Sequence, residues 1–393
     1  MIYPKARYIY QKFCNDFSLL ILSAGLALLS CSCHTIEKEK SSIPEEKENR
    51  AEHFELVEYP AFKILSIIDP WQKAGNALFS YCLAERKEYV PDSLSGIPFI
   101  RVPVRNYIVF STTHAGFLKA LGIESAITGA SGAEYLYDPE LRGSFLSGKI
   151  AEVGYPPSVN YEKILELQPE MVFLYGIESS VAAISKRLES VGIPSVIIGE
   201  YLENNPLGKL EWIRVFGALT GRIEEADSIY FAAVKEYNRL CMLVSKEISY
   251  RPVVLLGLPW KDTWYMAGGK SYTARMIMDA GADYIWKTDL SEEFIPLSVE
   301  AVMSKGIQSE YWLNPGSARS LSEITGRDRR YEIFLSRKQG RVYNNDRQLN
   351  QAGSNNFWEQ GTTEPQVVLK DLIKIFHPEL MSEHDFVYYR QLE

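Results

Sequence analysis

Residues 224–246 read EEADSIYFAAVKEYNRLCMLVSK, and this stretch decides the fold that the sequence predicts. Apolar residues recur in it at helical spacing: Ile229, Ala233, Tyr237, Leu240 and Val244. The same spacing begins near residue 210 and is interrupted at Thr220-Gly221, where glycine favours the end of a first helix. The second helix would be roughly 35 Å long at 1.5 Å per residue, which is long enough to link two separate parts of the chain.

Short apolar strands alternate with helices on both sides of this segment. Upstream, the predicted strands are 62–68, 78–83, 106–110, 171–174 and 194–198, and the predicted helices are 117–121, 160–167 and 181–191. Downstream, the predicted strands are 253–258, 311–313 and 341–343, and the predicted helices are 271–280, 299–305, 327–337 and 366–376. Such alternation is typical of a parallel sheet covered on both faces. The predicted fold is therefore α/β, with two Rossmann-like lobes at 61–205 and 250–393, joined by linker helices at 206–249 that include a single long α-helix.

The composition excludes one class of partner. The chain has 393 residues, of which 46% are hydrophobic and 23% are charged, as in an ordinary globular protein. The 42 Lys and Arg residues against 50 Asp and Glu residues give a formal net charge of −8. Because phosphate binding requires a basic face, this sign argues against nucleic acid as a partner.

Residues 1–30 form a predicted secretory signal peptide. Lys5, Arg7 and Lys12 precede an apolar run over 17–29, which is shorter than the roughly 20 residues of a membrane-spanning helix. The run ends in Leu28-Leu29-Ser30-Cys31, which resembles the lipobox of bacterial lipoproteins, where Cys31 accepts lipid after cleavage. An uncleaved signal anchor and a misplaced start codon are the alternatives, and Cys33 is a second candidate for lipidation.

Residues 31–60 are predicted to be a flexible tether. Ser, Glu, Lys and Pro dominate its first part, and such a segment buries too little apolar surface to offset the entropy of ordering. Cys33, Cys82 and Cys241 form no spaced framework, so neither a disulfide core nor a cysteine metal motif is predicted. We expect a monomeric lipoprotein in the periplasm, anchored in the inner or the outer membrane.

Ligands of open α/β sheets bind outside the carboxyl ends of the strands. In the first lobe this rule places Ser111, Thr112 and His114 at the mouth of a cleft, together with Tyr175 after the next strand. His114 invites a metal-ligand hypothesis, since a neutral imidazole binds haem iron or cobalt. An ordinary polar residue near a helix start is the more common use of a lone histidine.

In the second lobe, aromatic residues follow the strand at 253–258, namely Trp260, Trp264 and Tyr265. Indole and phenol groups offer flat apolar area with hydrogen-bonding edges, which suits a large planar or macrocyclic ligand. Packing of both tryptophans inside the lobe is an equal alternative. A further group either reaches the cleft or lies on an exposed helix face: Arg329, Arg330 and Tyr331.

Several short stretches occur in a characteristic order from about Tyr107 to the C-terminus. In the first lobe they are IVFSTTH at 108–114, VGY at 153–155, NYEKI at 160–164, LQPEMV at 167–172 and GIP at 192–194. In the second lobe they are GGKSY at 268–272, DAGA at 279–282 and PLSVE at 296–300. In this order they resemble the substrate-binding lipoproteins of ATP-binding-cassette importers for ferric siderophores, haem or cobalamin.

The resemblance implies a helix-linked, class III periplasmic binding protein that hands a metal chelate to permease and ATPase subunits. It also implies that Glu162 and Glu300 dock onto arginines of the permease. A carboxylate at a helix N-terminus is stabilised by the dipole and can be gripped by a planar guanidinium, although simple helix stabilisation would explain it too.

The remaining alternatives concern chemistry. Capture of a bare metal ion needs several converging His and acidic ligands, and the five histidines are scattered: His34, His53, His114, His377 and His384. No nucleophile elbow encloses Ser111, and the Gly268-Gly269-Lys270-Ser271 stretch lacks the spacing of a P-loop. We therefore expect no catalytic residue, resident metal or cofactor. A lipid-anchored hydrolase or chelatase, and a lipoprotein that serves an outer-membrane receptor, remain the alternatives.

Overall fold

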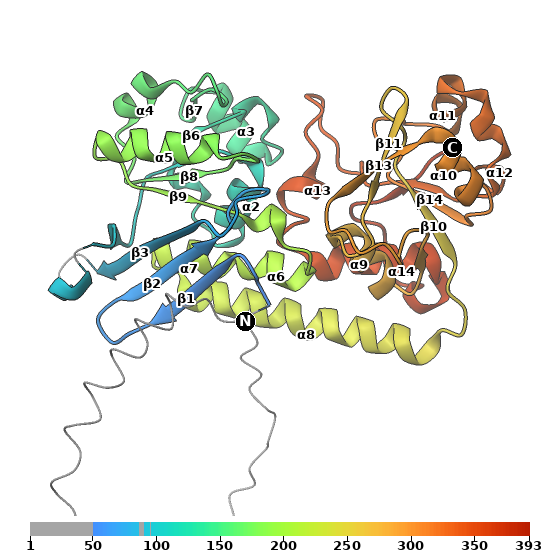
Figure 1. Ribbon diagram of the computed structural model, residues 1–393, viewed down its shortest axis with the longest axis horizontal. Coiled ribbons are helices and arrows are strands. Elements are labelled where there is room, and N and C mark those ends of the chain that lie inside the picture. The colour runs from blue at the N-terminus through green and yellow to red at the C-terminus, as the bar shows by residue number, and fades with distance from the viewer. Residues whose placement is uncertain (1–49, 86–89, 95) are drawn as a thin grey trace, which may run out of the picture. The chain divides into compact units, whose positions relative to one another are not determined.

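The structure is a computed structural model that describes residues 50–85, 90–94 and 96–393 (Figure 1). The predicted signal peptide, the lipidation candidates Cys31 and Cys33, and most of the predicted tether lie outside the described residues. Within the part of the chain that is described, no helix combines the length and apolar character needed to cross a membrane.

The folded body begins earlier than the predicted boundary at residue 61. An additional sheet of order β1-β2-β3-β4 is formed by β1 (Phe54–Glu58), β2 (Lys63–Ile68), β3 (Leu78–Glu85) and β4 (Phe99–Val102). The first three strands are antiparallel, and β4 runs parallel to β3. Upstream of β1, the carboxylate of Glu211 accepts hydrogen bonds from the backbone N–H groups of Arg50 and Ala51 at 2.7 and 2.9 Å. Residues 50–60 are therefore folded, and the prediction of a tether up to residue 60 was wrong at this end.

The first lobe contains a parallel sheet of order β7-β6-β5-β8-β9. Its strands are β5 (Tyr107–Val109), β6 (Ile127–Ala130), β7 (Ala151–Glu152), β8 (Met171–Leu174) and β9 (Ser195–Ile197). Its helices are α2 (Thr112–Ala120), α3 (Pro139–Leu146), α4 (Tyr161–Leu167) and α5 (Ser180–Ser190), with short 3₁₀ turns η3 (Ala133–Tyr135) and η4 (Glu200–Leu202). All four residues of β8 are buried, as expected for a parallel strand with helices on both faces.

The linker is formed by α6 (Pro206–Glu211), α7 (Ile213–Thr220) and α8 (Ile223–Glu247). Gly221 ends α7 with φ = 73°, a left-handed conformation that glycine adopts without strain. Helix α8 has 25 residues, and its buried stripe changes core along its length. Ala226, Tyr230 and Ala233 pack in the first lobe, whereas Tyr237, Leu240 and Val244 pack in the second. A single helix therefore joins both cores, as predicted.

The second lobe contains a sheet of order β12-β10-β14-β15-β16, in which only β16 is antiparallel to its neighbour. Its strands are β10 (Val253–Leu256), β12 (Asp283–Tyr284), β14 (Tyr311–Leu313), β15 (Val342–Asn344) and β16 (Arg390–Gln391). A separate two-stranded antiparallel sheet pairs β11 (Thr263–Ala267) with β13 (Phe294–Ser298). The helices are α9 (Tyr272–Asp279), α10 (Val299–Gly306), α11 (Leu321–Arg327), α12 (Leu335–Lys338), α13 (Asn356–Glu359) and α14 (Pro365–Phe376).

One predicted helix, at 327–337, is wrong. The chain leaves α11 at Asp328, whose backbone is extended with φ = −156°. The Asp328 carboxylate then accepts a hydrogen bond from the backbone N–H of Arg330 and starts a separate 3₁₀ turn, η5 (Arg329–Ile333). Aspartate at such a position competes with the helix for backbone hydrogen bonds, which is why the helical pattern breaks there.

Candidate functional site

A cavity of about 700 Å³ is lined by residues of both lobes. Its second-lobe wall lies at the carboxyl ends of three parallel strands, with Gly257 after β10, Asn314 after β14 and Asn345 after β15. The first lobe contributes Thr112 and Tyr135. The cavity therefore occupies the place where open α/β sheets bind ligands, and its volume is in the range of small-molecule sites.

Side-chain amides form the polar wall of the cavity. Asn344 donates hydrogen bonds to the carbonyl oxygens of Gly316 and Ala318 at 2.9 and 3.2 Å, and so holds the loop after β14 in place. Asn314 adopts a left-handed conformation with φ = 53°, which asparagine tolerates better than most residues. Its buried Oδ1 has no hydrogen-bond partner among the described residues. Asn314 lines the cavity, but its Oδ1 atom is buried and does not face the open volume.

Four large aromatic side chains that line the cavity are exposed, and we call them the aromatic rim: Tyr135, Tyr265, Phe294 and Trp358. Their exposed fractions are 51%, 48%, 68% and 56%, respectively. Exposed aromatic surface that gathers around one cavity is typical of a binding site. The rim offers flat rings from both lobes to a ligand that lies between them.

The cavity carries one uncompensated charge. The Asp346 carboxylate is paired with Arg390 through two contacts of 2.8 Å, so its charge is balanced locally. Arg319 is exposed, lines the cavity and has no side-chain hydrogen bond or ion pair within residues 50–85, 90–94 and 96–393. A free guanidinium binds carboxylate or other anionic oxygens in a forked geometry, so the cavity favours an anionic ligand.

Of the seven residues predicted to contact a ligand, Thr112 and Tyr265 line the cavity. Ser111 instead caps α2, because its side chain accepts a hydrogen bond from the backbone N–H of Thr113 at 3.2 Å. Tyr175 packs against the ring of Tyr201, with 5.1 Å between the centroids, and does not line the cavity.

The two tryptophans of the second lobe lie in different surroundings, and neither lines the cavity. Trp264 is fully buried, and its indole N–H donates to the carbonyl oxygen of Leu256 at 2.9 Å. Successive side chains of a strand point to opposite faces. Trp264 therefore points into the core, whereas its neighbour Tyr265 faces the cavity. Trp260 is 65% exposed in the loop before β11, with the Lys261 ammonium 4.4 Å from its ring centroid. The alternative of packing within the lobe applies to Trp264.

The predicted group at 329–331 does not line the cavity. Tyr331 is buried and packs against Trp264 and Trp312. Arg330 is exposed and pairs with Asp328 at 2.7 Å.

His114 is completely buried in the first lobe, so its imidazole does not reach the cavity. Neither ring nitrogen has a hydrogen-bond partner among the described residues, and Nε2 lies 3.9 Å from Oε2 of Glu200, which is also buried. Burial lowers the pKa of His114 to about 3 and raises the pKa of Glu200 to about 7. At neutral pH the histidine is uncharged inside the lobe, and the metal-ligand hypothesis finds no support in its position.

The described chain holds no group of three or more His, Cys, Asp or Glu side chains that could bind a metal ion. Glu162 and Glu300, the predicted docking residues, are exposed in the first turns of α4 and α10, which lie on the side of the body away from α8 (Figure 1). The Glu300 carboxylate lies 2.9 Å from the Arg330 guanidinium. An exposed pair of this kind is weak and can exchange partners.

Sequence reasoning missed most of the cavity wall. Asn314 and Asn345 follow directly after strands, so the rule that selected Ser111 and His114 would also have found them. Arg319 and Trp358 had no comparable signal, because Arg319 lies in a loop and Trp358 in the short helix α13, and the position of both depends on tertiary contacts.

Two α/β lobes on one long helix, with a cavity at the strand ends between them, define the helix-linked class of binding proteins. A family model described as periplasmic binding protein matches residues 108–342. The chain belongs to this family, whose members are substrate-binding proteins and not enzymes.

Two relatives are similar over most of the chain. An uncharacterized lipoprotein of Methanocaldococcus jannaschii is 30% identical over 289 residues, which make up 71% of this chain and 67% of that protein. A second uncharacterized lipoprotein of that organism is 22% identical and covers 96% of this chain and 99% of its own length.

Among solved structures, a periplasmic heme binding protein from Pseudomonas aeruginosa has a TM-score of 0.55 at 17% identity, covering 74% of this chain and 98% of its own. The structure of an ABC-type Fe3+-hydroxamate transport system from Saccharomonospora viridis has a TM-score of 0.53 at 17% identity, covering 70% and 94%. At these identities the likeness shows the fold.

Proposed function

We propose that this protein captures an anionic metal chelate in the cavity between its lobes and delivers it to an ATP-binding-cassette importer. The observation that carries the proposal is the combination of the aromatic rim with the unpaired guanidinium of Arg319. Flat rings provide contact area for a large planar or macrocyclic ligand, and the guanidinium selects anionic oxygens. Ferric siderophores, haem and cobalamin are the candidate cargoes, and the charge of Arg319 favours those with carboxylate or catecholate groups. Two fold neighbours support a chelate, because one is named as a heme binding protein and the other as an Fe3+-hydroxamate transport system.

A titration with haem, a ferric catecholate, a ferric hydroxamate and cobalamin tests the cargo, followed by visible absorbance. We expect one anionic chelate to bind at a ratio of one per chain, and Trp358→Ala to weaken it. Saturable binding that is unchanged by Trp358→Ala, or binding of none of the four probes, would contradict the proposal.

Delivery to a permease is proposed to use Glu162 and Glu300. Their carboxylates are exposed in the first turns of α4 and α10, where a guanidinium of a partner can reach them. We expect the double variant Glu162→Gln/Glu300→Gln to lose uptake of the chelate while it keeps the affinity of the purified protein. Glu166→Gln is a matched control, since Glu166 is an exposed glutamate of the same helix α4. Equal loss of uptake in the control would count against docking through these two residues.

The lipid anchor at Cys31 is proposed from the lipobox, and the lipoprotein names of two relatives support it. We expect the N-terminal peptide of the purified protein to begin at a lipid-modified Cys31. Cys31→Ala should move the protein from the membrane fraction to the soluble fraction, whereas Cys33→Ala should not. A soluble Cys33→Ala protein would assign the anchor to the other cysteine.

A further inference from the structure

A segment of the second lobe crosses to the first lobe. Residues 349–360, the crossing segment, lie between β15 and α14 but place α13 beside α2 of the first lobe (Figure 1). The Thr113 hydroxyl donates to the carbonyl oxygen of Trp358 at 3.1 Å. The lobes are therefore held by direct contacts in addition to the linker helix.

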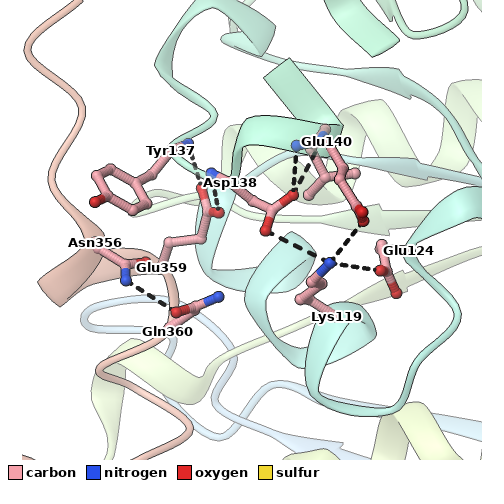
Figure 2. Close-up of polar contacts among 9 residues, drawn as sticks. Lys119, Glu124, Tyr137, Asp138, Glu140, Asn356, Glu359 and Gln360 are labelled. Carbon is pink, nitrogen blue, oxygen red and sulfur yellow. Dashed lines mark hydrogen bonds and ion pairs between the residues drawn. The ribbon is translucent and has the colours of Figure 1, made fainter. Parts of the chain in front are cut away.

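Glu359 is the central residue of this contact. Its carboxylate is 1% exposed and accepts hydrogen bonds from the backbone N–H groups of Tyr137 and Asp138, at 2.8 and 2.9 Å (Figure 2). These two residues lead into α3, whose N-terminal dipole favours a carboxylate at this place. A side chain of one lobe thus satisfies backbone donors of the other.

The backbone of α2 lies very close to the backbone of the crossing segment at Gly116. A Cβ atom on Gly116 would lie 2.1 Å from the carbonyl oxygen of Glu359 and 2.8 Å from its carbonyl carbon. Glycine inside a helix is less favourable than alanine, and Gly116 has no left-handed backbone that would require it. The close approach of α13 is therefore what Gly116 permits.

The charged groups around Glu359 belong to the first lobe. Lys119 is paired with Glu124 at 2.7 Å, with Glu140 at 3.0 Å and with Asp138 at 3.5 Å (Figure 2). Burial and the neighbouring Asp138 carboxylate raise the pKa of Glu359 to about 7, while its two amide donors and Lys119 act in the opposite direction. The cost of burying this carboxylate offsets part of its hydrogen bonding, so the net stabilisation from the contact is smaller than its hydrogen bonds alone would give.

We propose that Glu359 and Gly116 form a reversible latch that closes the two lobes over the cavity. The crossing segment also supplies Asn355 and Trp358 to the cavity wall, so one movement closes the latch and completes the cavity. A continuous linker helix has few soft dihedrals, so it allows only a limited separation of the lobes, and the latch adds to the free energy that this separation requires. The inference does not depend on which chelate is bound.

Gly116→Ala tests the latch without weakening α2, because alanine is the better helix former. The measurement is NMR-detected hydrogen exchange at the amides of Tyr137 and Asp138 in the ligand-free protein, with the radius of gyration from small-angle scattering. We expect exchange to accelerate about tenfold or more, as one hydrogen bond to a charged group implies, and the radius to increase. Gly143→Ala is the matched control, since a Cβ there meets nothing within 4 Å in helix α3.

Glu359→Ala provides a second, independent variant with the same expected result. Its control is Glu152→Ala, because the Glu152 carboxylate also accepts backbone hydrogen bonds, from Gly132 and Ala133, but within one lobe. If the two amides exchange at the wild-type rate in both Gly116→Ala and Glu359→Ala, the latch proposal is wrong. The same holds if the control variants accelerate exchange equally.

Discussion

The two lobes follow the same folding rule, but the polar residues at their strand ends have different fates. In the first lobe, His114 and Glu200 are completely buried. In the second lobe, Asn314 and Arg319 line an open cavity. The crossing segment lies against the cleft side of the first lobe, at α2, whereas the strand ends of the second lobe remain accessible. His114 packs against the rings of Phe173 and Phe216 inside the first lobe, which keeps its imidazole away from the cavity. Strand ends thus locate a site, and the packing of each side chain decides whether it reaches the ligand.

The largest expected effect separates a core tryptophan from a rim tryptophan. Trp264→Ala removes a fully buried indole and should lower the free energy of unfolding by about 3–5 kcal/mol. Trp358→Ala removes a half-exposed ring and should change it by about 1 kcal/mol or less. Denaturation in urea measures both. Equal losses would mean that the rim is part of the core.

The next effect is a pH dependence of the free energy of unfolding, which arises from the buried side chains of His114 and Glu200 in the first lobe. The pKa of His114 is about 3 in the folded state, whereas its ordinary value is 6.5. Its contribution to the free energy of unfolding is therefore present above pH 6.5 and is lost as the pH falls toward 3. The pKa of Glu200 is about 7 in the folded state, whereas its ordinary value is 4.5. Its contribution to the free energy of unfolding is therefore present below pH 4.5 and is lost as the pH rises to 7.

Between pH 4.5 and 6.5 the two contributions have opposite slopes, each up to about 1.4 kcal/mol per pH unit. Relative to the wild type, stability in this range should fall with rising pH in His114→Phe and rise with pH in Glu200→Gln. The free energy of unfolding measured from pH 4.5 to 6.5 checks both slopes. Parallel curves for all three proteins would show that the pair does not titrate as described.

Arg319→Gln should have a smaller effect that is confined to binding. Loss of a hydrogen bond between charged groups predicts an affinity for an anionic chelate that is about 10- to 100-fold weaker. Stability should be unchanged because the side chain is exposed and unpaired. Isothermal titration compares the variant with Arg329→Gln, which removes the same charge outside the cavity. An equal loss in both would point to a general charge effect.

The smallest effect concerns Ser111. Because its hydroxyl caps α2, Ser111→Ala should lower the free energy of unfolding by about 1 kcal/mol and leave chelate affinity unchanged. Thermal unfolding and the same titration measure the two quantities. If Ser111→Ala has normal stability but binds the chelate more weakly, Ser111 contacts the ligand instead.

The sequence predicted the architecture because its strongest signals are periodic. The apolar stripe of α8 and the alternation of strands and helices depend on local pattern, and both agree with the structure. The crossing segment has no such pattern, since it is held in place by contacts such as the hydrogen bond from Asn355 to the carbonyl of Asn345. Which face of β11 is buried also depends on the partner strands, so Trp264 and Tyr265 could not be told apart from composition.

We propose above all that a metal chelate binds between the aromatic rim and Arg319. Crystals of the protein grown with a bound ferric chelate allow the iron to be located directly by anomalous scattering at its absorption edge. We expect a single strong peak inside the cavity, with anionic oxygens of the chelate facing the Arg319 guanidinium. A peak elsewhere on the molecule, with the cavity filled only by solvent, would contradict it.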